Sequence, residues 1–222
     1  MPDGQTPRQL ARAANIERIK ELALRQLASE GATSLSLRAI ARELNLVSSA
    51  IYRYYPSRDE LITALILDAY ADLADALEAA GGTRRSPRRR WADTCDGLRA
   101  WAVAQPHRFA LVYGSAIPGY AAPADTIAPA ARVVRALAAP VVDGAPAPRP
   151  GLPRPLRRQL DAVTAELDLP LEQAGTLRLV GAFARLVGLL TLELNGHFVG
   201  GFEPADALYA ALVEDEADAL GL

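Results

Sequence analysis

The stretch ELNLVSSAIYRYYPSRDEL, residues 43–61, places three tyrosines and an arginine within four positions immediately before a proline. Asn45 to Val47 is long enough only for a tight turn, and asparagine tolerates the left-handed backbone that such turns need. A short helix at about 48–55 is expected next, and Pro56 should end it because proline disfavours helical geometry in the residue before it. The stretch therefore predicts a turn followed by a short, aromatic helix.

The sequence on either side of this stretch has helical periodicity. Upstream, an apolar stripe predicts a first helix from Ile16 to Leu27, and Ser36 is the expected N-cap of a second helix at 37–44. Downstream, Ser57 and Glu60 have the spacing of a capping box that opens a fourth helix at 57–80. A helix, a short turn and a second helix have the form of a helix-turn-helix, whose second helix enters the major groove of DNA.

The helix at 48–55 is expected to present a polar face outward. Ile51 and Tyr55 lie four positions apart and are predicted to face inward, so the small and aromatic residues around them point out. Small side chains let the backbone approach base edges, while tyrosine hydroxyls and arginines suit phosphate oxygens. The predicted DNA contacts are Ser36, Arg38, Ser48, Ser49, Ala50, Tyr52, Arg53, Tyr54 and Arg58. The alternative is that the helices simply pack, with tyrosines at their edges.

NLVSSAIYRYYPSRDEL, together with the upstream IKELALRQLASEGATSLSLRAIAREL, closely resembles the N-terminal domain of the TetR family of bacterial transcriptional regulators over residues 16–80. The chain departs from the family pattern at Asn45, where glycine is usual, and at Val47, where a helix-capping serine is frequent; Ser48 is the alternative cap. The resemblance implies a homodimeric repressor that binds a palindromic operator in double-stranded DNA. The family features present are Ile19, Ala23, Gly31, Leu37, Ile40, Ala41, Tyr52, Tyr54, Tyr55, Arg58 and Leu61.

The composition is typical of a folded protein, and the N-terminal part of the chain is mildly basic. Half of the residues are hydrophobic and 23% are charged. Residues 1–60 hold nine Lys or Arg against seven Asp or Glu, although the whole chain has a net charge of −2. No signal peptide is evident, and the longest apolar run, residues 179–194, contains Arg185 and Glu193, so a cytoplasmic chain without a membrane span is expected.

The remainder of the chain reads as helices at 87–104, 106–113, 125–142, 154–167, 171–196 and 204–220, separated by segments rich in Gly and Pro. We therefore predict an all-α fold. Its expected domains are a DNA-binding helix-turn-helix domain at 1–56, with a flexible arm at 1–13, a connecting helix at 57–80 and a ligand-binding and dimerisation domain at 81–222.

HRFALVYGSAIPGYAAPADT, residues 107–126, resembles the C-terminal domain of a TetR subgroup called the WHG type. That resemblance implies a pocket for a small-molecule effector, and the aromatic residues suggest a largely apolar one. The predicted ligand-binding residues are Trp91, Cys95, Leu98, Trp101, Phe109, Tyr113, Tyr120 and Phe183. Plain core packing is the alternative for each of them. Glu193, on an otherwise apolar helix, is expected to be paired.

A leucine seam predicts how two subunits meet. Leu186, Leu190 and Leu194 recur along one expected helix, and Leu208 and Leu212 along the next. Two such helices from each subunit would make a four-helix dimer interface. The alternative is burial within one subunit. The five arginines of TRRSPRRRW, residues 83–91, are expected in a solvated loop rather than on flanking DNA.

A helical-bundle enzyme and a small-molecule-binding protein that does not bind DNA are the rival functions. The enzyme lacks support, because the chain has no Glu-x-x-His pair, no phosphate-binding glycine loop and no clustered metal ligands. Its lone cysteine, Cys95, cannot form an intramolecular disulfide, and His107 and His197 are far apart in sequence. We therefore expect no catalytic site, no metal and no cofactor.

Overall fold

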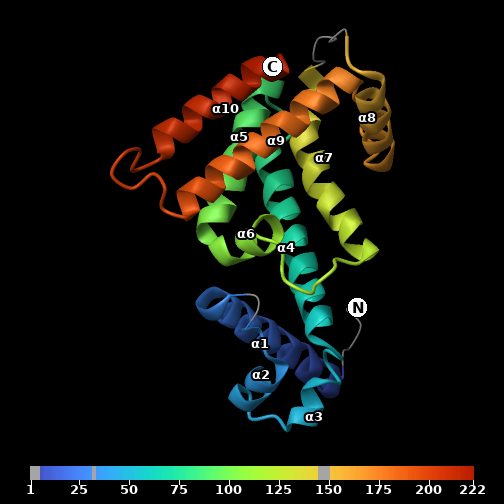
Figure 1. Cartoon of the computed structure of the whole chain (residues 1–222), viewed down its shortest axis with the longest axis vertical. Helices are drawn as coiled ribbons and strands as arrows, with labels where there is room; N and C mark the ends of the chain where they lie inside the picture. Colours follow the sequence, from blue (N-terminus) through green and yellow to red (C-terminus); the bar gives the residue numbers. More distant parts are fainter. Residues whose placement is uncertain (1–5, 32–33, 145–150) are drawn as a thin grey trace. The chain divides into compact units, whose positions relative to one another are not determined.

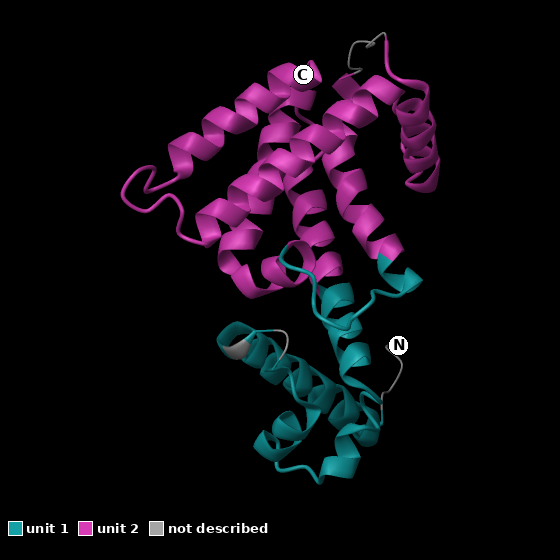
Figure 2. Cartoon of the chain, in the orientation of Figure 1, with its two compact units in different colours: residues 1–68, 114–126 teal, residues 69–113, 127–222 magenta. Residues whose placement is uncertain are grey.

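A computed structural model describes residues 6–31, 34–144 and 151–222 of the chain (Figure 1). Within these ranges the regular structure is entirely helical, which confirms the predicted all-α fold. The chain divides into two compact units (Figure 2). Unit 1 comprises residues 1–68 and 114–126, and unit 2 comprises residues 69–113 and 127–222.

Unit 1 contains helices α1 (Pro7–Glu30), α2 (Leu37–Glu43) and α3 (Ser48–Ile51) and the first part of α4 (Arg58–Gly81). Apolar residues from all four helices form its core, because each helix has one apolar stripe to bury. The fully buried members are Ile19 and Ala23 of α1, Ile40 and Ala41 of α2, Ile51 of α3, and Leu61 and Ile62 of α4.

Helix α1 begins well before its predicted start, so the expectation of an arm through residue 13 is wrong for residues 7–13. Thr6 is the N-cap, and its hydroxyl accepts a hydrogen bond from the Gln9 backbone N–H while the Gln9 side chain accepts from the Thr6 N–H. Pro7 stands at the first helical positions, where its missing N–H costs nothing. Residues 1–5 of the predicted arm lie outside the described residues.

Helix α3 is shorter than the predicted 48–55 and ends at Ile51. The backbone N–H groups of Arg53 and Tyr54 donate to carbonyls only three residues back, so a tight turn follows the helix. Pro56 limits the segment only from Tyr55 onward, since proline has no N–H and restricts the residue before it, so the earlier end at Ile51 comes from the change to hydrogen bonds three residues apart.

Unit 2 holds the second part of α4 and the helices α5 (Pro87–Ala104), α6 (Pro106–Tyr113), α7 (Ile127–Gly144), α8 (Arg154–Glu166), α9 (Gln173–Leu194) and α10 (Asp206–Leu220). Each lies within a few residues of its predicted range. Helix α5 packs against α7, α9 and α10, and its residues Trp91, Cys95 and Leu98 are fully buried. Helix α4 runs unbroken from unit 1 into unit 2.

Candidate functional site

The turn between α2 and α3 has the predicted left-handed backbone. Asn45 has a φ of 55°, and the Leu46 N–H donates to the Ala41 carbonyl at 2.9 Å. Before this turn, the Ser36 hydroxyl accepts from the Ala39 N–H at 3.3 Å and caps α2 as predicted. The turn thus starts α3 beside the buried side of α2, in the arrangement of a helix-turn-helix.

Helix α3 buries Ala50 and Ile51, which are 7% and 0% exposed. The prediction that Ala50 faces outward for DNA contact is therefore wrong. Adjacent helical residues lie only about 100° apart, so both can face the core when a short helix packs closely against its neighbour. Ser48 and Ser49 remain exposed at the start of the helix, and Tyr52 and Arg53 are exposed just after it.

Val47, not Ser48, is the N-cap of α3, and no side chain caps the helix. The alternative cap at Ser48 is therefore wrong. Its hydroxyl and that of Ser49 stand on an exposed helix start. Such a surface suits phosphate oxygens and base edges that accept hydrogen bonds.

Tyr54 is held by α1 rather than standing free. The Asn15 side-chain amide donates to the Tyr54 hydroxyl at 3.0 Å, and the Arg12 guanidinium lies 5.2 Å from the centre of the Tyr54 ring. Arg12 also donates to the Arg53 carbonyl at 3.4 Å. These contacts are not predicted from the sequence, because the first helix is expected there to begin at Ile16, after Arg12 and Asn15.

Two other predicted contacts differ in their surroundings. Arg38 on α2 is exposed, and no carboxylate among the described residues pairs with it. Arg58, in the first turn of α4, is partly buried and pairs with Asp59 at 3.4 Å. The Ser57 hydroxyl accepts from the Glu60 N–H, which is one half of the predicted capping box.

Comparison with known proteins decides the family. Residues 19–65 match the bacterial regulatory proteins of the tetR family, and residues 91–215 match the tetracyclin repressor-like C-terminal domain. The chain belongs to the TetR family. It is a DNA-binding transcriptional regulator rather than an enzyme, as its relatives are.

Relatives and solved structures cover most of the chain. The HTH-type transcriptional regulator Rv1816 of Mycobacterium tuberculosis is 40% identical over 191 residues, which span 82% of this chain and 81% of the relative. The regulator Mb1846 of Mycobacterium bovis matches equally well. The crystal structure of SCO4313 is similar, with a TM-score of 0.82 and 36% identity over 96% of this chain and all of that one. A TetR-family regulator from Marinobacter aquaeolei, 18% identical with a TM-score of 0.63 over 95% of this chain and 97% of that one, shares the fold.

Three of the predicted ligand residues of this TetR-family chain lie in the packed core of unit 2. Trp91 is fully buried, and its indole N–H donates to the Val213 carbonyl at 3.1 Å. Cys95 and Leu98 are fully buried as well, and burial raises the pKa of the Cys95 thiol well above its ordinary value. Packing in the core is enough to explain why these three residues are buried. A ligand-binding role for them therefore remains a prediction.

Phe109, Tyr113 and Phe183 come together in an aromatic cluster, which Tyr70 of α4 joins. The Tyr113 ring centre lies 6.3 Å from that of Tyr70, 5.3 Å from Phe109 and 5.6 Å from Phe183. Burial raises the pKa of the Tyr113 hydroxyl, so it stays protonated. Tyr70 was missed because its helical spacing on α4 is equally typical of core packing.

The two other predicted ligand residues have polar partners. Trp101 donates its indole N–H to Asp72 at 2.9 Å, and Gln105 and Arg108 donate to the same carboxylate oxygen. Tyr120 belongs to unit 1, where its hydroxyl is 2.9 Å from that of Thr63. The cluster around Tyr113 therefore brings three predicted ligand residues into direct ring contact.

The predicted dimer seam needs a correction. Leu186 and Leu190 are 2% and 0% exposed, so they belong to the subunit's own core, as the alternative had it. Leu194, Leu208 and Leu212 are partly exposed. A neighbouring face of α9 lines an apolar groove with α10, and Leu192 in it is 43% exposed. The groove residues are Ala184, Arg185, Leu186, Gly188, Leu189, Leu192, Leu212 and Glu216.

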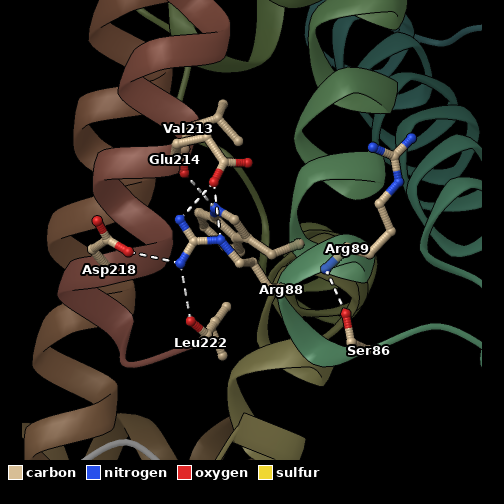
Figure 3. A network of polar contacts seen from close by, with 8 residues as sticks. Ser86, Arg88, Arg89, Val213, Glu214, Asp218 and Leu222 are labelled. Carbon is tan, nitrogen blue, oxygen red and sulfur yellow. Dashed lines mark hydrogen bonds and ion pairs between the residues drawn. The ribbon is translucent and has the colours of Figure 1, made fainter.

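Charged residues of unit 2 are largely paired, including Glu193 as predicted. Arg99 donates to both Glu193 carboxylate oxygens, and burial in part offsets the rise in the Arg99 pKa that these bonds cause. Of the arginines in residues 83–91, Arg84 and Arg85 lie in an exposed loop as predicted, whereas Arg88, Arg89 and Arg90 belong to α5, which begins at Pro87. Arg88 binds Glu214, Asp218 and the Leu222 carbonyl on or next to α10 (Figure 3). Arg88 therefore links α5 to α10, and Arg90 links α5 to Asp143 of α7.

None of the helices in residues 6–31, 34–144 and 151–222 combines the length and the apolar character needed to cross a membrane.

Proposed function

We propose that this TetR-family regulator is a repressor in the cytoplasm, that it binds a palindromic operator as a homodimer, and that a largely apolar effector releases it. The observation that carries the proposal is the exposed surface at α3, where Ser48, Ser49, Tyr52 and Arg53 stand outward while Ala50 and Ile51 anchor the helix in the core. Among the described residues, the side chains of Ser48, Ser49, Tyr52 and Arg53 have no hydrogen-bond or ion-pair partner, so their polar groups remain available to DNA.

The exposed residues divide into two chemical roles. Ser48 and Ser49 are small and lie at the N-terminal end of α3, the end that reaches base edges in a helix-turn-helix. Tyr52, Arg53 and Arg38 carry long side chains with hydroxyl or guanidinium donors, which suit phosphate oxygens. The serines are therefore assigned to sequence selection and the longer side chains to affinity.

A symmetric dimer would account for a palindromic operator. We assign its interface to the α9–α10 groove, since Leu192 and Leu212 expose apolar surface beside the small residues Ala184 and Gly188. Small residues allow two helices to approach closely, and an isologous contact places the same patch on both subunits. Two recognition helices would then sit about one DNA turn, roughly 34 Å, apart.

The effector site is assigned to the aromatic cluster of Tyr70, Phe109, Tyr113 and Phe183. Aromatic rings offer an apolar ligand a large contact area, and the Tyr113 hydroxyl offers one donor. Tyr70 lies on α4, the helix whose first turn carries Arg58. A ligand that displaces Tyr70 would act on the same rigid element that enters the DNA-binding unit.

Replacing single exposed residues should separate the two roles at α3. Tyr52→Phe, which removes only a hydroxyl, is expected to weaken binding to operator and unrelated DNA by the same factor, because phosphate contacts carry no sequence information. Ser49→Ala is expected to lower the preference for operator by about 1 kcal/mol, because it removes a base-edge contact. Fluorescence anisotropy with both duplexes measures this; a changed sequence preference in Tyr52→Phe would contradict the assignment.

A charge in the α9–α10 groove should produce monomers that remain folded. Leu192→Asp is expected to abolish dimerisation, because the dimer would bury an unpaired carboxylate. Val163→Asp, at an exposed position of α8, is the matched control and should stay dimeric. Leu190→Asp should instead unfold unit 2. Sedimentation velocity and thermal unfolding distinguish these results, and a dimeric Leu192→Asp would move the interface elsewhere.

Effector and operator should oppose each other by one shared factor. If aromatic compounds bound by the protein lower its operator affinity, saturating operator DNA must lower their affinity equally, because the coupling free energy is reciprocal. Such coupling is typically 5–150-fold. Calorimetric titration with and without operator DNA measures it. If the effector bound with equal affinity in the presence and absence of operator DNA, the proposal that it releases the protein from the operator would be wrong, even if operator binding itself were intact.

A further inference from the structure

A basic notch lies at the start of α1, outside the helix-turn-helix. It has a volume of about 470 Å³ and is lined by Thr6, Arg8, Gln9, Arg12, Arg53 and Tyr54, with Ala11 and Asn15 completing it. All of these residues belong to unit 1. The notch thus joins the first turns of α1 to the exposed turn that follows α3.

The notch concentrates positive charge, and none of the described residues that line it is a carboxylate. Arg8, Arg12 and Arg53 line it, and residues 6–16 and 47–58 contain no Asp or Glu. Within the described part of the chain, none of the three arginines forms an ion pair. Arg12 uses one N–H on the Arg53 carbonyl and keeps further donors, since a guanidinium has five.

Helix α1 adds to this positive potential instead of reducing it. Its first turn holds Arg8 and no acidic residue, although the positive end of the helix dipole favours Asp or Glu there. A cation at this end is unfavourable in the free protein. The arrangement becomes favourable once an anion occupies the notch, because the arginines and the helix dipole then act on it together.

Tyr54 supplies a positioned hydroxyl beside the arginines. Its oxygen accepts from the Asn15 amide at 3.0 Å, which leaves the phenol hydrogen available for a further acceptor. The Arg12 guanidinium packs over one face of the Tyr54 ring, with its central carbon 5.2 Å from the ring centre. Together these groups offer several convergent donors and no acceptor carboxylate, which is the donor set that a phosphate diester requires.

We propose that this notch binds a phosphate of the DNA backbone, with Arg8 as a direct contact and Arg12 both contacting it and positioning Tyr54. The inference rests on the proposed DNA-binding function and extends the contact surface from α3 to the start of α1. A contact of this kind adds affinity for any sequence.

Arg8→Ala tests the notch most cleanly, because Arg8 is exposed and its loss removes no ion pair among the described residues. Arg18→Ala is the matched control: Arg18 is also exposed, lies on the same helix about 15 Å further along, and its loss changes the net charge equally. Binding is measured on an unrelated duplex of about 30 base pairs over a range of salt, since phosphate contacts are independent of sequence.

Arg8→Ala is expected to weaken binding and to reduce the slope of log affinity against log salt by about 0.9, whereas Arg8→Lys and Arg18→Ala keep the wild-type slope. If Arg8→Ala bound DNA with the affinity and salt slope of the wild-type protein, the proposed phosphate site in the notch would be wrong. An equal loss of affinity in Arg18→Ala would also contradict it. Either result would leave the DNA-binding function itself intact. Failure of the wild-type protein to bind any duplex would overturn both.

Discussion

The burial of Ala50 and Ile51 against α2 is the constraint on which the DNA-binding surface depends. These two side chains set the rotation of a four-residue helix that has too few residues to be stable alone. The left-handed turn at Asn45 brings α3 to that position. With one side of α3 fixed in the core, Ser48 and Ser49 are left exposed, and the chain after Ile51 turns Tyr52 and Arg53 outward.

The distribution of ion pairs explains how a chain with a net charge of −2 presents a basic surface. In unit 2, several arginines are matched with carboxylates of neighbouring helices, as Arg88 is with Glu214 and Arg99 with Glu193. In unit 1, Arg8, Arg38 and Arg53 have no carboxylate partner among the described residues. Unpaired arginines are therefore present where the proposed phosphate contacts lie, even though the whole chain is acidic.

Much of the fold follows from local sequence signals, while the facing of individual side chains does not. The helices of unit 2 could be placed within a few residues because Gly and Pro segments separate them. The start of α1 also has a local signal, because Thr6, Pro7 and Gln9 have the spacing of an N-cap, a first-turn proline and a capping-box partner. The burial of Ala50 and of Leu190 depends on which neighbour each helix packs against, and a periodic stripe does not specify that neighbour.

The central proposal is that the surface around α3 and the start of α1 selects and holds DNA. Its most direct test is binding of the wild-type protein to duplex DNA from upstream of its own coding sequence, compared with an unrelated duplex of equal length, across a range of salt. We expect tighter binding to the upstream duplex, and affinity for both that falls steeply with salt because arginines displace counterions from phosphates. Equal affinity for the two duplexes, or affinity that does not change with salt, would contradict the account.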